Sequence, residues 1–133
     1  MSENFTLEEL VASTAAYNLK IDNTPPAEAV VNLTLLADKT LQPVRDLWGA
    51  PVFVSSGYRC PQLNRIVGGA VNSQHMTGEA ADISVGSPEA NKRLFDMIVK
   101  SNTPYDQLID ENKYQWIHVS YSKTKNRKEI LHL

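Results

Sequence analysis

The sequence has 133 residues, the size of one ordinary domain, which excludes a multidomain enzyme or a long repeat array. Apolar residues make up 42% and charged residues 21% of the chain, a globular composition that excludes a disordered protein. The 13 basic and 15 acidic residues give a formal net charge of -2, too balanced to predict nucleic-acid binding. We therefore expect residues 1–133 to form one folded domain.

Helical and strand patterns follow one another along the chain and predict an α+β domain. In chain order we expect a helix over 7–17, a long core helix over 26–48, a strand over 51–55, a short helix over 61–67, a strand over 80–85, a helix over 88–101, strands over 107–110 and 115–121, and an edge strand over 130–133. A capping box, Thr6-Leu7-Glu8-Glu9, begins the first helix. Pro43 lacks a backbone N–H, so we expect a kink or a short break near Lys39 to Gln42.

Two histidines and one aspartate stand at informative places in this pattern. Asp82 lies on the polar face of the strand over 80–85, because side chains alternate across a strand. His118 lies on the polar face of the strand over 115–121, so pairing of the two strands would bring Asp82 and His118 together. His75, in the irregular loop before Asp82, would close the group. The residues predict a site of two histidines and one carboxylate.

Such a ligand set suits Zn²⁺, because two neutral imidazoles and one carboxylate leave a fourth tetrahedral position for a water molecule with a pKa of about 7. Spacing alone leaves a metal-free, hydrogen-bonded His–Asp pair open as the alternative. Cys60 is the single cysteine, so any metal site must use histidine and carboxylate ligands. A cysteine hydrolase that uses Cys60 beside Arg59 is a further alternative, although no His–Cys motif accompanies it. Trp116 and Tyr121 line either the core or a substrate groove.

Short motifs extend over nearly the whole chain. They are Ser56-Gly57-Tyr58-Arg59, Leu63-Asn64, Val67-Gly68-Gly69-Ala70, Ser73-Gln74-His75-x-x-Gly78-x-Ala80-Ala81-Asp82-Ile83 and Trp116-Ile117-His118-Val119-Ser120-Tyr121. Together they closely resemble the zinc D-Ala-D-Ala carboxypeptidase family, and the Phe-Thr-Leu-Glu-Glu opening resembles its small, single-domain, often phage-encoded branch. The resemblance implies the Hedgehog/DD-peptidase fold, a small antiparallel sheet with helices packed on it.

The resemblance also implies roles for individual residues. His75, Asp82 and His118 match the zinc ligands of the family. Arg59 matches the arginine that binds a substrate carboxylate, for which its planar fork of donors is suited. Ser73 is expected to make a hydrogen bond within the site loop. Members cleave peptide bonds in bacterial cell-wall stem peptides, either ahead of a terminal D-Ala or between L-Ala and D-Glu.

The general base departs from the commonest pattern of the family. Many relatives carry an acidic residue three positions before the second histidine, where this chain has Gln115, and glutamine cannot act as a base. The small branch instead carries a Gln-Leu-Ile-x-Glu run, which matches residues 107–111 and implies Glu111 as the base. Because Gln115 replaces an acid, the alternative function is a catalytically silent, zinc-containing module that binds the cell wall or a partner.

The function that the resemblance implies is a zinc metallopeptidase acting on the peptidoglycan stem peptide. We expect a monomer with no nucleic-acid or membrane partner. The N-terminus has no basic stretch followed by an apolar run, and no segment approaches the roughly 20 apolar residues of a membrane span. We therefore expect synthesis in the cytoplasm without a signal peptide, and access to the cell wall through a lysis partner, as for a phage endolysin.

Overall fold

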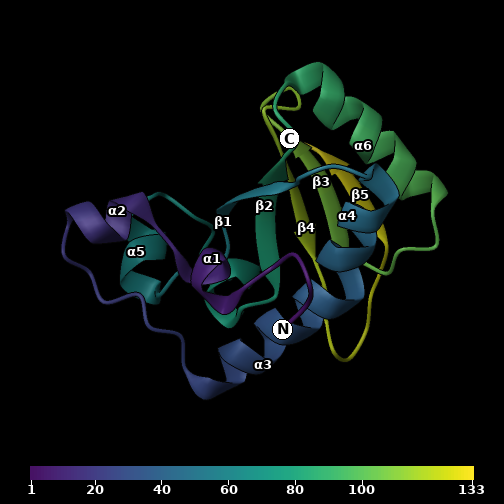
Figure 1. Ribbon diagram of the computed structural model, residues 1–133. Coiled ribbons are helices and arrows are strands. Elements are labelled where there is room, and N and C mark those ends of the chain that lie inside the picture. The colour runs from purple at the N-terminus through teal and green to yellow at the C-terminus, as the bar shows by residue number, and fades with distance from the viewer.

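The computed structural model describes residues 1–133 and mixes helices with a single sheet (Figure 1). The helical segments are α1 (Leu7–Val11), α2 (Thr14–Asn18), α3 (Ala27–Leu36), η1 (Ala37–Leu41), α4 (Gln42–Trp48), α5 (Pro61–Ile66), η2 (Gln74–Thr77) and α6 (Pro88–Lys100). The strands are β1 (Phe53–Ser56), β2 (Ala80–Ser84), β3 (Gln107–Glu111), β4 (Trp116–Ser120) and β5 (Glu129–His132). The expected α+β class is confirmed. None of the helices has the length and apolar character that crossing a membrane requires.

The strands lie in the order β1-β2-β4-β3-β5. The first three pairings across the sheet are antiparallel, as expected. The last one is parallel, with Gln107 of β3 opposite Glu129 of β5, so the expected wholly antiparallel sheet is wrong at this edge. The physical reason is the connection over 121–128, which passes across the start of β3. Strand β5 consequently begins at the end of the sheet where β3 also begins.

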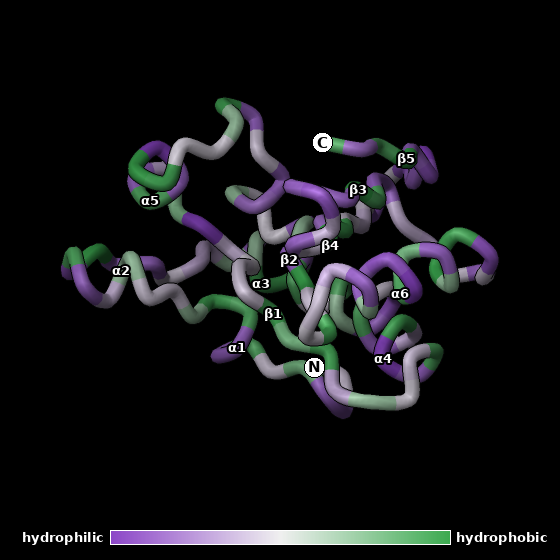
Figure 2. Tube along the Cα trace, turned by 90° about the horizontal axis from the view of Figure 1, so that it is seen from above, coloured by the Kyte–Doolittle hydropathy of each residue, from purple (hydrophilic) through white to green (hydrophobic).

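The apolar core lies on the face of the sheet that α4 and α6 cover. Ala81 and Ile83 of β2 belong to one buried cluster with Ile117 and Val119 of β4. Figure 2 shows α4 and α6 on one side of the sheet and α5 on the other. Because side chains alternate along each strand, the neighbours of the core residues point to the α5 side. The open face of the sheet is therefore where polar strand residues gather.

The helix expected over 7–17 is wrong as a single element, because the structure has the two short helices α1 and α2 there. The chain leaves α1 in an extended conformation at Ala12, and Ser13 begins α2. The Ser13 hydroxyl accepts a hydrogen bond from the backbone N–H of Ala16 at 3.1 Å. A serine in this position satisfies N–H groups that a continuous helix would use internally, so it starts a new helix.

The long helix expected over 26–48 is confirmed together with its irregularity. Helix α3 continues into η1, one π-helical turn, and then into α4. Pro43, in the first turn of α4, has no N–H to donate to the preceding turn, so the hydrogen-bond ladder changes register just before it. The predicted break near Lys39 to Gln42 thus falls on the π-helical turn.

Candidate metal centre

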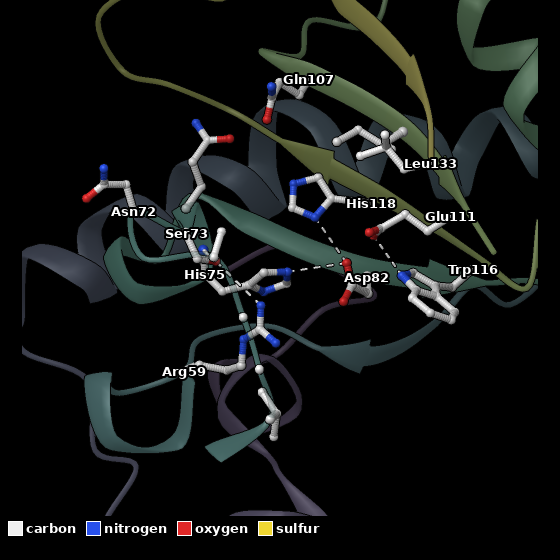
Figure 3. A pocket seen from close by; sticks show the side chains of 16 residues that line it. Arg59, Asn72, Ser73, His75, Asp82, Gln107, Glu111, Trp116, His118 and Leu133 are labelled. Atoms are coloured by element: carbon white, nitrogen blue, oxygen red, sulfur yellow. Dashed lines mark hydrogen bonds and ion pairs between the residues drawn. The ribbon is translucent and has the colours of Figure 1, made fainter. Parts of the chain in front are cut away.

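Three side chains that suit a metal ion converge on the open face of the sheet. Asp82 of β2 lies directly opposite His118 of β4 in the strand register. Its Oδ1 atom is 3.3 Å from Nε2 of His75 and 3.1 Å from Nδ1 of His118. The three ligand atoms all lie within 4.8 Å of one another, and Figure 3 shows both imidazole rings turned toward the carboxylate. The predicted meeting of these residues is confirmed.

Backbone contacts hold His75 in one orientation. Its ring Nδ1 donates to the carbonyl of Gly57 at 2.6 Å, which leaves Nε2 facing Oδ1 of Asp82. Gly57 has no room for a side chain, because an added Cβ would lie 2.1 Å from the carbonyl oxygen of Leu10. The hydroxyl of Ser73 accepts from the backbone N–H of His75 at 3.1 Å and starts η2. The imidazole ring is therefore held with Nε2 turned toward Asp82.

The chemistry of these donors fits Zn²⁺. Two imidazole nitrogens and one carboxylate oxygen are a common catalytic zinc set, and they leave a fourth position open. Burial by itself would raise the pKa of Asp82, but hydrogen bonds and charge from His118 and His75 outweigh it and lower that pKa. The carboxylate is thus ionised at neutral pH, as a ligand to a cation must be.

A cavity of about 420 Å³ opens above the three ligands. Each residue predicted for the site lines it: Arg59, Ser73, His75, Asp82, Glu111 and His118. Sequence reasoning missed other parts of the wall, namely Asn72, Gln107, Ile109 and Leu133. Leu133 reaches the cavity because β5 runs parallel to β3, and a pairing of that kind leaves no local signal in the sequence.

Arg59 presents a positive charge to the cavity without a carboxylate partner. Its Nη2 donates to the hydroxyl of Ser73 at 3.4 Å, and its Nε is buried without a hydrogen-bond partner. Burial lowers the pKa of Arg59, while the negative charges of Asp82 and Glu111 act in the opposite direction. A guanidinium stays protonated through shifts of this kind. The site therefore holds a charged, bidentate donor that no acidic side chain of the protein occupies.

Glu111 lines the cavity from the end of β3, and Figure 3 shows it extending toward Asp82 and His118. Its Oε2 accepts a hydrogen bond from Nε1 of Trp116 at 2.8 Å. Gln115 is exposed in the turn between β3 and β4 and does not line the cavity. Glu111 on β3 is therefore the acidic side chain that is placed to act as a base at this site, whereas position 115 lies outside the cavity.

Two residues weighed in the sequence lie outside the cavity. The thiol of Cys60 accepts from the backbone N–H of Leu63 at 3.4 Å and caps α5, so it points to the helix and not to the ligands. The cysteine-hydrolase alternative has no support from this placement. Tyr121 packs against the apolar core, whereas Trp116 lines the cavity.

Comparison with known proteins matches residues 3–120 to the peptidase M15 family. The chain belongs to this family. A zinc D-Ala-D-Ala carboxypeptidase from Streptomyces albus G is 48% identical to this M15 chain over 48 residues. That alignment covers 35% of the M15 chain and 19% of the relative, so the two proteins share one segment. The predicted family is confirmed, and the comparisons support the expected class, a zinc metallopeptidase, with Zn²⁺ as its metal.

Proposed function

We propose that this M15 chain is a zinc-dependent peptidase that hydrolyses peptide bonds in bacterial cell-wall stem peptides. The observation that carries the proposal is the convergence of His75, Asp82 and His118 in a cavity that also contains Arg59 and Glu111. The similarity to a zinc D-Ala-D-Ala carboxypeptidase supports this class of substrate. We assign the mixed sheet and its helices to the Hedgehog/DD-peptidase fold, and the cleaved bond to a D-Ala-D-Ala or an L-Ala-D-Glu linkage.

Four residues of the cavity carry the chemistry of this reaction. His75, Asp82 and His118 would hold the metal, and Zn²⁺ bound there supplies a Lewis acid for the scissile carbonyl and for water. Glu111 takes a proton from the attacking water at its free carboxylate oxygen and passes it to the leaving amine nitrogen. In this step the C–N bond of the substrate breaks and a C–O bond forms.

Arg59 and Ser73 position the substrate. The guanidinium of Arg59 accommodates a substrate carboxylate in a bidentate pair, which fixes the scissile bond over the ligands. Ser73 supports this arrangement, because its hydroxyl contacts both the Arg59 guanidinium and the backbone of His75. Substrates with a free carboxylate beside the cleaved bond should therefore be preferred.

The test combines metal analysis with digestion of purified peptidoglycan and mass measurement of the released peptides. We expect one zinc per chain and release of free D-Ala or of cleaved stem peptides. The His118→Ala protein should lose both the zinc and the activity. A zinc-loaded protein that sediments with peptidoglycan and releases nothing would instead support the silent binding module that Gln115 suggests. The expected monomer and the expected cytoplasmic synthesis stay predictions for gel filtration and cell fractionation.

A further inference from the structure

We propose that Trp116 is a positioning residue for Glu111, with its indole N–H holding one carboxylate oxygen so that the other oxygen faces the metal ligands. This inference rests on the proposed function, because only there does Glu111 have a proton to move. The indole is a donor without a lone pair to offer, so it orients a carboxylate without competing for that proton.

The strand register places the two side chains together. Glu111 lies directly opposite Trp116 at the last pair of the β3–β4 ladder, and both residues line the cavity. The distance from Nε1 of Trp116 to Oε2 of Glu111 is 2.8 Å, drawn as a dashed line in Figure 3. Trp116 lies on the same strand face as His118, so the indole turns toward the ligands and away from the apolar core.

The turn between the two strands fixes this pair. Three consecutive residues of the turn, Asn112, Lys113 and Tyr114, have positive φ values of 51°, 55° and 64°. The backbone N–H of Gln115 then donates to the carbonyl of Glu111 at 3.1 Å. Non-glycine residues in the left-handed region are uncommon, so the surrounding structure must impose this turn. A turn of this kind sets the separation of Glu111 and Trp116 closely.

The charges in the cavity explain why Glu111 needs such a restraint. Arg59 and Glu111 carry opposite charges and line the same cavity, yet they form no ion pair. Pairing between them would occupy the proposed base and the proposed carboxylate anchor at once. The Trp116 hydrogen bond holds Glu111 on one side, and the Ser73 hydroxyl contacts Arg59 on the other. Trp116 therefore keeps both groups free for the substrate.

The first test is Trp116→Phe in the zinc-loaded protein, which removes the donor and keeps an aromatic ring. We expect unchanged zinc content, a fall in kcat of about 10-fold and a change in KM of less than about 3-fold. In a Glu111→Ala background the same change should cause no further loss of the residual activity. A rise in KM alone, or an equal loss in both backgrounds, would show that Trp116 contacts the substrate directly and would overturn the positioning role.

A second pair of variants guards against a general packing defect. Trp116→Gln keeps an N–H donor, and Trp116→Leu places a side chain of about the size of glutamine there without a donor. The Trp116→Gln protein should therefore retain several times more activity than the Trp116→Leu protein. Equal activity of the two would contradict the proposal. The indole N–H resonance of Trp116, assigned by its loss in Trp116→Phe, should also shift in Glu111→Ala, and an unmoved resonance would contradict the hydrogen bond.

The proposed function and the positioning role fail in different ways. A wild-type protein that binds zinc and hydrolyses no stem peptide contradicts both. An active wild-type protein with a fully active Trp116→Phe variant contradicts the positioning role and leaves the proposed function standing.

Discussion

Arg59 lines the cavity and forms no ion pair with a carboxylate of the chain. Arg59→Lys keeps the positive charge but loses the planar fork of donors. For a peptide with a free carboxylate, we expect the variant to lose about 1.5–3 kcal/mol of transition-state stabilisation. The measurement is kcat/KM with a stem peptide and with its amide-capped form. Equal turnover of the two peptides by the wild-type protein would contradict the proposed role of Arg59.

Glu111 is the residue whose assignment depends most on geometry. Glu111→Gln keeps the size and the hydrogen bond from Trp116 but removes the base, so hydrolysis should fall by roughly 10²–10⁴. Zinc content and melting temperature should stay close to those of the wild type. Glu3→Gln, at an exposed position, is the matched control and should retain full activity. Unchanged hydrolysis in the Glu111→Gln protein would remove Glu111 from the mechanism.

Asp110 is adjacent to Glu111 and lies on the other face of β3. It is buried and forms a hydrogen bond with the imidazole of His132 of β5. Asp110→Asn should therefore lower the melting temperature by weakening the β3–β5 edge, with kcat retained. Thermal denaturation and peptide hydrolysis, measured on the same sample, separate the two effects. A loss of kcat like that of Glu111→Gln, without a loss of stability, would contradict this division between the faces.

At the scale of elements, one carboxylate joins η2 to the segment before β5. The buried Asp106, just ahead of β3, accepts hydrogen bonds from the Gln74 side chain at 2.9 Å and from Nε of Arg127 at 2.9 Å. It also accepts from the backbone N–H of Arg127 at 3.0 Å. Because Gln74 precedes His75, this link ties the loop that carries a metal ligand to the edge of the sheet.

The hydrogen bonds of Asp106 should make the free energy of unfolding depend on pH in the acidic range. Hydrogen bonds from the Arg127 side chain hold the pKa of Asp106 at about 2, below its ordinary value of 3.8. Because the pKa of Asp106 is lower in the folded state, its carboxylate stabilises the fold fully at pH values above the ordinary pKa of 3.8. This stabilisation is lost as the pH falls toward about 2. The side chain of Arg127 is 50% exposed, so solvent screens the pair and we expect a smaller contribution than from a fully buried pair.

Urea denaturation of the wild type and of Asp106→Asn tests this contribution. A chelator is present throughout, so that release of metal in acid does not enter the comparison. The wild type should be more stable near neutral pH, and the difference should shrink as the pH falls below about 4. A difference that stays constant down to pH of about 2 would contradict the assignment to the Asp106 carboxylate.

At the scale of the whole molecule, the ligands join segments that are distant in the sequence. His75 comes from η2, Asp82 from β2 and His118 from β4. A metal ion that binds all three stabilises the folded state only, so chelation should lower the melting temperature by about 10 °C. The measurement is thermal denaturation with and without chelator. His118→Ala should show almost no difference between the two conditions, and a chelator effect of full size in that variant would contradict the ligand set.

Local rules of the sequence predicted most of the helices and strands and the convergence of His75, Asp82 and His118 on one face of the sheet. The two-residue alternation of strands separates Asp82 and His118 from the core residues beside them, whatever the rest of the fold does. Pro43 lacks its N–H in every context, so the break in the long helix was predictable. Ser13 shows the limit of such rules. A helix N-cap within an amphipathic pattern does not change the spacing of the apolar residues, so the start of α2 was not predicted.

Tertiary structure decided the features that depend on how distant segments cross. The sequence alone could not predict the parallel β5, since the path of residues 121–128 across the start of β3 sets its direction. It could not predict that Arg59 lacks an acidic partner, nor that Trp116 contacts Glu111, because these facts depend on register and on a turn of unusual backbone conformation. Alternation and capping act between near neighbours, whereas strand direction, register and charge pairing depend on contacts between segments far apart in the chain.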